Sequence, residues 1–209
     1  FFGIESNMTV VELSPGGGWY TEIFANYLHE PGNLIAAHFD SNSNRENFKR
    51  GRANFEKKMQ SSSMYNNVSI VNLSSKLASP NSVDAVVTFR NLHNWIGPQM
   101  DKIFKNSYKA LKPGGIFGIV EHRANPGTSL DVMKKSGYVT ESYAIAIAEK
   151  HGFVLVDKSE INANPKDLKN YERGVWTLPP SLRLKDKDKE KYLEIGESDR
   201  MTLLFKKPN

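Results

Sequence analysis

The chain has 209 residues, of which 39% are hydrophobic and 24% charged, as in a soluble globular domain rather than a disordered chain. No run of about 18 apolar residues marks a membrane-spanning helix, so no membrane association is expected. The absence of cysteine excludes a disulfide framework, a cysteine nucleophile and thiolate-bound zinc or iron–sulfur sites. The net charge of +5 is a mild excess that is compatible with an acidic substrate or nucleic acid as partner.

Short apolar segments alternate with segments of helical periodicity, which predicts an α/β domain with a mostly parallel sheet. Strands are expected at Met8–Leu13, Leu34–Phe39, Val68–Leu73, Val83–Phe89, Ile116–Glu121, Phe153–Glu160 and Met201–Lys206. Helices are expected with an apolar face of Ile23, Phe24, Tyr27 and Leu28, around Phe48, Phe55 and Met59, over Gln99–Leu111, and after a cap at Thr140.

A long connection, residues 161–200, separates the last two expected strands. A stretch of this length inside a compact domain is usually functional or flexible. The chain shows no internal repeat and no linker composition. We therefore expect a single domain over residues 1–209, with an insertion at about 161–200.

Three consecutive glycines follow the first expected strand, in the run Glu12-Leu13-Ser14-Pro15-Gly16-Gly17-Gly18-Trp19-Tyr20. Glycine lets the backbone approach a ligand closely, and the first turn of the next helix offers free N–H groups to an anion. In open α/β sheets, ligands bind at the carboxyl ends of the strands, where the strand order reverses. The turn therefore predicts a cofactor site. A dinucleotide fingerprint would need glycine at Thr21, and a P-loop would need a lysine, so both phosphate-binding alternatives are weak.

This turn resembles the first motif of the class I S-adenosylmethionine-dependent methyltransferases, an acidic residue at a strand end followed by a glycine-rich loop. Glu12, Gly16 and Gly18 match the motif, and Ser14 stands in place of its first glycine. The Leu111–Gly115 turn before the fifth strand is also typical of that superfamily. The resemblance covers essentially the whole chain. It implies S-adenosylmethionine as cofactor and a Rossmann-like, doubly wound α/β fold, with a seven-stranded, mostly parallel sheet whose last strand is antiparallel.

More narrowly, the chain resembles a poorly characterised group of predicted bacterial methyltransferases. The runs that carry this resemblance are PGGGWYTE, FRNLHNW, VEHRA, NANPKD, GVWTLPP and GESDRMTL. The closer resemblance is specific in sequence but implies little about the substrate.

The resemblance implies cofactor contacts from the glycine turn and from the ends of the second and fourth strands. The candidate cofactor-binding residues are Glu12, Pro15, Gly16, Gly17, Gly18, Trp19, Tyr20, His38, Asp40, Arg90 and Asn91. Gly16 and Gly18 would approach the methionine moiety, and Glu12 would anchor its amino group or order the loop. The acid that usually holds the ribose aligns with His38. Asp40, two residues on, either takes over that contact or caps the next helix.

Methyl transfer is an in-line displacement, which requires an aligned acceptor and, for some acceptors, removal of a proton. His93 and His122 follow the fourth and fifth strands and are candidate general bases, and Arg123 is a candidate cation for an anionic acceptor. The alternatives are a packing role for His93 and a surface ion pair at the end of the fifth strand. A metal shared by the two histidines with Glu121 or Asp40 is a minor alternative.

The candidate acceptor-binding residues are Asn94, Trp95, Asn162, Arg173 and Trp176. The first two follow the fourth strand, and the other three lie in the 161–200 connection, where they would line a pocket or form a lid. Trp176 would either stack on a planar substrate or plug the core. The basic segment 45–58 is expected to be a solvated helix face, with anion binding as the alternative.

We expect transfer of a methyl group to a small-molecule acceptor. Nucleic acid is not favoured, because the fourth strand is not followed by the Asn/Asp-Pro-Pro-aromatic motif of nucleic-acid amino-methyltransferases. The alternatives are a non-catalytic or metal-binding protein that keeps the fold, and a nicotinamide-dependent oxidoreductase. The cytoplasm is the expected compartment because the cofactor is made there, and an exported form with a removed signal peptide is the alternative.

Overall fold

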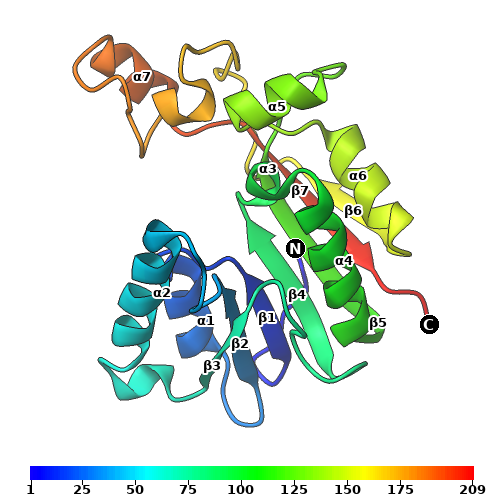
Figure 1. Ribbon diagram of the computed structural model, residues 1–209. Coiled ribbons are helices and arrows are strands. Elements are labelled where there is room, and N and C mark those ends of the chain that lie inside the picture. Colours follow the sequence, from blue (N-terminus) through cyan, green and yellow to red (C-terminus); the bar gives the residue numbers. More distant parts are fainter.

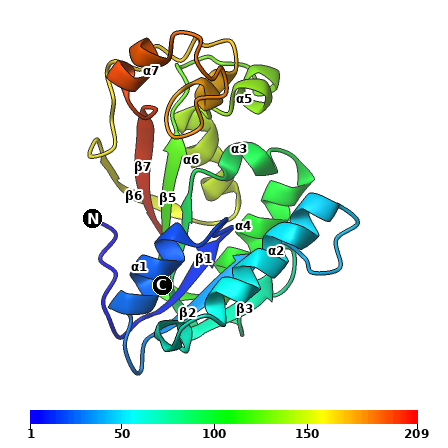
Figure 2. The same ribbon diagram turned by 90° about the vertical axis from the view of Figure 1, so that its left-hand side faces the viewer.

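A seven-stranded sheet forms the middle of the molecule in the computed structural model, which describes residues 1–209 (Figures 1 and 2). The strands are β1 (Thr9–Leu13), β2 (Asn33–His38), β3 (Val68–Asn72), β4 (Val83–Phe89), β5 (Leu111–His122), β6 (Val154–Ser159) and β7 (Arg200–Lys206). Their order in the sheet is β3-β2-β1-β4-β5-β7-β6. β7 alone runs opposite to the other strands, so it pairs antiparallel with both β5 and β6, and all other pairs are parallel. The predicted seven-stranded, doubly wound sheet with an antiparallel last strand is confirmed.

Helices cover both faces of this sheet (Figure 2). They are α1 (Trp19–Tyr27), α2 (Glu46–Met59), α3 (Leu92–Trp95), α4 (Pro98–Ala110), α5 (Leu130–Ser136), α6 (Glu141–Lys150) and α7 (Lys189–Ile195), with 3-10 turns η1 (Ser63–Tyr65) and η2 (Gly174–Thr177). α1 and α2 pack on one face, and α4 and α6 pack on the other. None of the helices combines the length and apolar character that a membrane span requires.

The core is divided by the sheet, because successive residues of a strand point to opposite faces. Val10 packs with Phe24 of α1, whereas its neighbour Val11 belongs to the cluster that contains Phe104 of α4. Both valines are completely buried. A parallel strand covered on both faces reads as a continuous apolar run, which is why the first strand could be predicted from sequence.

The buried face of α1 differs from the predicted one. Ile23 and Tyr27 were expected to face the core, but they are 48% and 47% exposed. Phe24 and Leu28 are buried as predicted, and they are joined by Thr21 and Ala25. In this orientation Phe24 packs on Val10 of β1, and the Thr21 hydroxyl donates a hydrogen bond to Glu12 at the end of the same strand.

Two further differences concern short elements. The predicted fifth strand begins at Ile116, whereas β5 begins at Leu111 and passes the Lys112–Gly115 turn with a shift in its register against β4. Helix α5 was not predicted, because its seven residues are too few for a periodic pattern. It is capped by Ser129, whose hydroxyl accepts a hydrogen bond from Val132, and it ends at Gly137 in the left-handed conformation.

The connection between β6 and β7 lies beyond the carboxyl ends of β4 and β5 and carries η2 and α7 (Figure 1). The Tyr138 hydroxyl donates to the Asp167 carboxylate at 3.0 Å, and the Asp199 amide donates to the same carboxylate at 2.8 Å. Arg123 at the end of β5 pairs with Asp199 and with Glu160. We propose that this connection is an insertion within a single domain, because these contacts tie its two ends to β5.

Replacing Gly174 by alanine should release η2 from α5. Gly174 has a φ of +55°, and a Cβ atom there would lie 2.1 Å from the carbonyl oxygen of Ser136. Gly127→Ala is the matched control, since its φ is +79° but a Cβ would meet nothing within 4 Å. The control should cost about 1–2 kcal/mol of unfolding free energy for its backbone conformation. Gly174→Ala should cost about 1–3 kcal/mol more in chemical denaturation. Equal losses would contradict the tight docking of η2.

Candidate active site

Two adjoining cavities open at the carboxyl ends of the strands. The main cavity, of about 420 Å³, is lined by residues that follow β1, β4 and β5 and by part of the β6–β7 connection. The side cavity, of about 270 Å³, lies toward β2 and α2. Ser14, Gly16, Asn91 and Asn94 contribute to both walls, so the two cavities lie side by side. The strand order reverses between β1 and β4, which is where doubly wound sheets bind their ligands.

The loop between β1 and α1 presents bare backbone to these cavities. Ser14 and Gly16 adopt left-handed backbone conformations, with φ values of 53° and 59°. A Cβ atom on Gly16 or Gly17 would meet nothing within 4 Å, so both glycines face open space. The buried hydroxyl of Ser14 has no hydrogen-bond partner in the protein. A cradle of this kind, with an unsatisfied polar atom beside it, fits a ligand that contacts the loop closely.

His38 and Asn91 hold the loop from the two neighbouring strands. The Phe39 amide donates to Nδ1 of His38 at 2.7 Å, so Nε2 carries the proton and donates to the Gly16 carbonyl at 3.1 Å. The Asn91 side chain donates to the Ser14 carbonyl at 3.2 Å. Burial is the main cause that lowers the pKa of His38, which favours a neutral ring. The histidine that replaces the usual acid therefore anchors the loop.

Glu12 is a buried carboxyl group in the wall of the main cavity. It is 2% exposed, and it accepts a hydrogen bond of 2.5 Å from the Thr21 hydroxyl. Burial raises its pKa to about 7, although Thr21 and the charge of Lys58 work in the opposite direction. A positively charged ligand group beside Glu12 would favour the ionised form. The residue is thus suited to hold an ammonium group.

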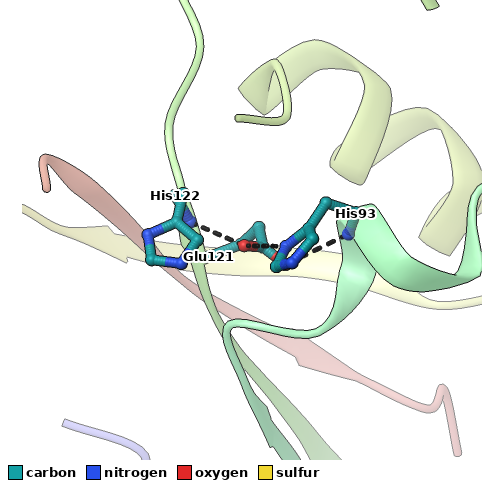
Figure 3. A group of neighbouring side chains, drawn as sticks. All are labelled: His93, Glu121 and His122. Carbon is teal, nitrogen blue, oxygen red and sulfur yellow. Dashed lines mark hydrogen bonds and ion pairs between the residues drawn. The ribbon is translucent and has the colours of Figure 1, made fainter. Parts of the chain in front are cut away.

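A second buried carboxylate, Glu121, orients His93 (Figure 3). Nδ1 of His93 lies 3.1 Å from Oε1 of Glu121, and the amides of His122 and His93 donate to the carboxylate at 2.8 and 3.4 Å. Burial works to raise the pKa of Glu121, but the electrostatic interactions and hydrogen bonds with His93 and His122 outweigh it and lower this pKa. The ionised carboxylate therefore accepts the Nδ1 proton of His93, which leaves Nε2 for other contacts.

His122 lies on the other side of the same carboxylate. Its Nδ1 atom is hydrogen-bonded to the Ser198 hydroxyl at 2.6 Å. Burial, reinforced by nearby positive charges, lowers its pKa to about 3 despite the opposing charge of Glu121. The ring is therefore neutral at physiological pH. It serves as a hydrogen-bonding group in the wall of the main cavity.

His93, Glu121 and His122 also satisfy the spacing of a metal site, because one ligand atom of each lies within 4.8 Å of the others. Asp40, the other carboxylate considered for such a site, is not part of this group. The Glu121 oxygens already accept hydrogen bonds from the His93 ring and from two amides. Both oxygens of the Glu121 carboxylate therefore have hydrogen-bond donors within the protein.

The structure brings most of the predicted site residues together. In the wall of the main cavity lie Glu12, Pro15, Gly16, Gly17, Trp19, Tyr20, Arg90, Asn91, His93, Asn94, His122 and Trp176. In the wall of the side cavity lie His38 and Trp95, again with Gly16, Asn91 and Asn94. Their roles stay predictions, but their convergence from five segments of the chain is a property of the fold.

Gly18 and Asp40 lie outside both cavities. Gly18 faces α2, where a Cβ atom would lie 3.0 Å from the Phe55 ring, so this glycine allows α1 and α2 to pack closely. The Asp40 carboxylate accepts a hydrogen bond of 2.9 Å from the Asn42 amide and stabilises a turn. It therefore neither lines the cavity for a ribose nor caps α2, whose N-cap is Arg45.

Three further candidates also lie outside the cavities. The Arg123 guanidinium is engaged by Asp199 and Glu160, and these contacts raise its pKa further. Asn162 donates to the Thr202 hydroxyl at 2.8 Å, and Arg173 is exposed. These residues support the β6–β7 connection or face solvent, so we do not propose them as catalytic or acceptor-binding groups.

Sequence reasoning missed Arg200 and Arg183 in the main cavity, and Phe39, Arg45, Phe48 and Gln99 in the side cavity. Arg200 could have been found from topology. Because β7 is antiparallel, its first residue lies at the same edge of the sheet as the last residue of β5, and it pairs with His122. The basic segment 45–58 likewise contributes Arg45 to the side cavity, although most of it is a solvated helix face as expected.

Glu12→Gln should stabilise the protein at pH 8 far more than at pH 5. Because the pKa of Glu12 is raised from 4.5 to about 7, the unfolded chain releases this proton more readily than the folded one. The unfolding free energy of the wild type therefore falls as the pH rises through this window, by about 3 kcal/mol. Glutamine does not ionise, so the variant does not lose this free energy. The difference in unfolding free energy between Glu12→Gln and the wild type, measured in urea titrations, should therefore grow by that amount from pH 5 to pH 8.

Glu190→Gln, at an exposed position of α7, controls for the loss of one acidic group and should show no such widening. A gap between Glu12→Gln and wild type that does not change with pH would contradict the effect of burial on Glu12.

Comparisons with known proteins identify the family of the chain. The family model described as "Methyltransferase domain" matches residues 11–119, which is 109 of the 209 residues. No curated protein sequence matches the chain.

Solved structures share the fold at low sequence identity. A SAM-dependent methyltransferase from Aquifex aeolicus is 15% identical, with a TM-score of 0.62 over 99% of this chain and 85% of its own. One from Methanosarcina mazei is 13% identical, with a TM-score of 0.64 over 98% and 94%. A geranyl diphosphate methyltransferase, solved in complex with SAM, is 10% identical, with a TM-score of 0.66 over 99% and 81%. With the family model matching more than half of the sequence, the chain belongs to the methyltransferase domain family.

Proposed function

We propose that this protein binds S-adenosylmethionine across the two cavities and transfers its methyl group to a small-molecule acceptor. The observation that carries the proposal is the open backbone of Gly16 and Gly17 beside the buried carboxyl group of Glu12. Membership of the methyltransferase domain family supports methyl transfer. The geranyl diphosphate methyltransferase with the same fold was solved with SAM bound, which supports the same cofactor here.

The chain's own residues can hold each part of this cofactor. Glu12 would bind the ammonium group, and the free N–H groups at the start of α1 would face the carboxylate. Phe39 and Trp95 line the side cavity and would contact the adenine. No carboxylate lines the side cavity, so we propose that polar side chains such as Gln99 face the ribose in place of an acid.

His93 is the better candidate for a general base. S-adenosylmethionine supplies a methyl group on a sulfonium, and the protein must align the acceptor and, where needed, take its proton. The ionised Glu121 fixes the tautomer of His93 and would stabilise the charge that its ring gains. His122, with its pKa lowered to about 3, is too weak a base for this task near neutral pH.

The walls of the main cavity favour a small acceptor. The β6–β7 connection covers the strand ends at Val175, Trp176 and Pro179, so the main cavity has a volume typical of small-molecule sites, which the cofactor and the acceptor would share. The edge of the Trp176 ring lies against His93, with 5.8 Å between ring centroids. A planar or apolar part of the acceptor would lie against this tryptophan, within reach of the base.

A series of substitutions at Gly17 tests the cofactor site. Gly17 does not have a left-handed φ, and a side chain there would meet only open space, so the fold should tolerate substitution. Because that space is the cradle for the cofactor, Gly17→Ala, Gly17→Val and Gly17→Leu should weaken binding of S-adenosylmethionine progressively, by tenfold or more for leucine. Calorimetric titration gives the affinities and thermal unfolding confirms the fold. Equal affinity across the series would place the cofactor elsewhere.

Substitutions at His93 and Glu121 test the base. His93→Gln should lower kcat by about 10²–10⁴-fold for an acceptor that loses a proton. Glu121→Gln should also lower kcat while leaving the affinity for S-adenosylmethionine unchanged. Production of S-adenosylhomocysteine from a panel of small acceptors is the measurement. His122→Gln, on the other side of Glu121, is the matched control and should lower kcat less. An undiminished kcat in His93→Gln would exclude His93 as the base.

A further inference from the structure

Two arginine side chains lie in the wall of the main cavity beside His122. Arg90 follows β4 and has a left-handed backbone, with a φ of 63°. Arg200 is the first residue of β7, and its backbone lies opposite that of His122 where β5 and β7 pair. The two guanidinium groups are close enough for the charge of Arg90 to contribute, after burial, to lowering the pKa of Arg200. The fold therefore places two like charges together at one end of the cavity.

These charges are poorly neutralised by the protein. Arg90 takes part in none of the ion pairs of the structure. Arg200 pairs only with Glu197, whose side chain is half exposed, and its Nε atom is buried without any hydrogen-bond partner. The Arg200 side chain itself is only 11% exposed. Burying a cationic donor without an acceptor is costly, so the arrangement is suited to an anion that arrives with a ligand.

Arg90 follows β4, the strand next to β1, whereas the backbone of Arg200 lies further from the expected position of the cofactor. The carboxylate of the cofactor is expected at the β1–α1 loop, whereas β7 is the third strand from β1 in the sheet. With neighbouring strands about 4.8 Å apart, the start of β7 lies about 14 Å from the end of β1 across the sheet. Glu12 is the only carboxylate in the wall of the main cavity, against Arg90, Arg183 and Arg200. Glu121 offsets part of the charge of Arg200, but a bound sulfonium would add positive charge, so the wall still favours an anionic group on a ligand.

We infer that Arg90 and Arg200 form an anion-binding subsite for the methyl acceptor, which is therefore a small molecule with a carboxylate or phosphate group. This inference rests on the proposed function, since it concerns the acceptor of the same reaction. Guanidinium groups bind both kinds of anion through paired N–H donors. Trp176, covered on one side by Arg183 at 4.6 Å from its ring centroid, provides the adjoining apolar wall.

The test uses inorganic phosphate and acetate as probes, titrated calorimetrically into the protein with and without saturating S-adenosylhomocysteine. We expect at least one probe to bind the wild type, and Arg200→Gln and Arg90→Gln each to weaken that binding tenfold or more. The acetate and phosphate arms distinguish the two anion classes. Arg50→Gln, at an exposed position of α2, is the control and should bind like the wild type. Thermal unfolding checks that each variant is folded.

Three outcomes would overturn the inference. In the first, neither phosphate nor acetate binds the wild-type protein. In the second, Arg90→Gln and Arg200→Gln bind the anion as tightly as the wild-type protein does. Alternatively, Arg200→Gln weakens S-adenosylhomocysteine tenfold but leaves 5′-methylthioadenosine, which lacks the carboxylate, unchanged; the arginines then hold the cofactor. Failure of the proposed function would show separately, as wild-type protein that does not bind S-adenosylhomocysteine while the anion titration is still readable.

Discussion

The loop between β1 and α1 is fixed from both sides by side chains of the neighbouring strands, and the site depends on this constraint. His38 from β2 donates to the Gly16 carbonyl, and Asn91 beyond β4 donates to the Ser14 carbonyl. The loop can therefore leave Gly16 and Gly17 bare toward the cavity without collapsing onto it. A backbone surface of this kind approaches a ligand more closely than any side chain allows. The proposed cofactor cradle is thus held in place by the strands on either side of β1.

The site is assembled at the expense of stability. Glu12 is buried with a raised pKa, Arg200 is buried with a free donor, and Ser14 holds a left-handed backbone with an unpartnered hydroxyl. Each of these features costs folding free energy in the free protein and would be relieved by a ligand of matching charge. They all lie along one edge of the sheet, whereas the core on both faces is apolar and closely packed. Function and stability are therefore separated in space within one fold.

The sequence predicted the sheet well because its signals are local. Apolar runs such as Val83–Phe89 and the capped helix after Thr140 were found within a residue or two. The cradle was also predictable, since the glycines are adjacent in the chain. The partners of Arg123 were not, because Glu160 and Asp199 lie 37 and 76 residues further along the chain. Asp40 was assigned to a ribose or a helix cap, whereas it forms a short turn with Asn42. Arg200 was missed although its position follows from the antiparallel last strand, because the segment before it was interpreted without that topology.

The most direct test of this account is calorimetric titration of the wild-type protein with S-adenosylmethionine and, separately, with a nicotinamide dinucleotide. The account predicts one-to-one binding of S-adenosylmethionine at micromolar concentrations and no binding of the dinucleotide, because Thr21 occupies the position of the third glycine in a dinucleotide fingerprint. A folded sample that binds the dinucleotide, or that binds neither molecule, would contradict the claim that the β1–α1 loop is a cradle for S-adenosylmethionine.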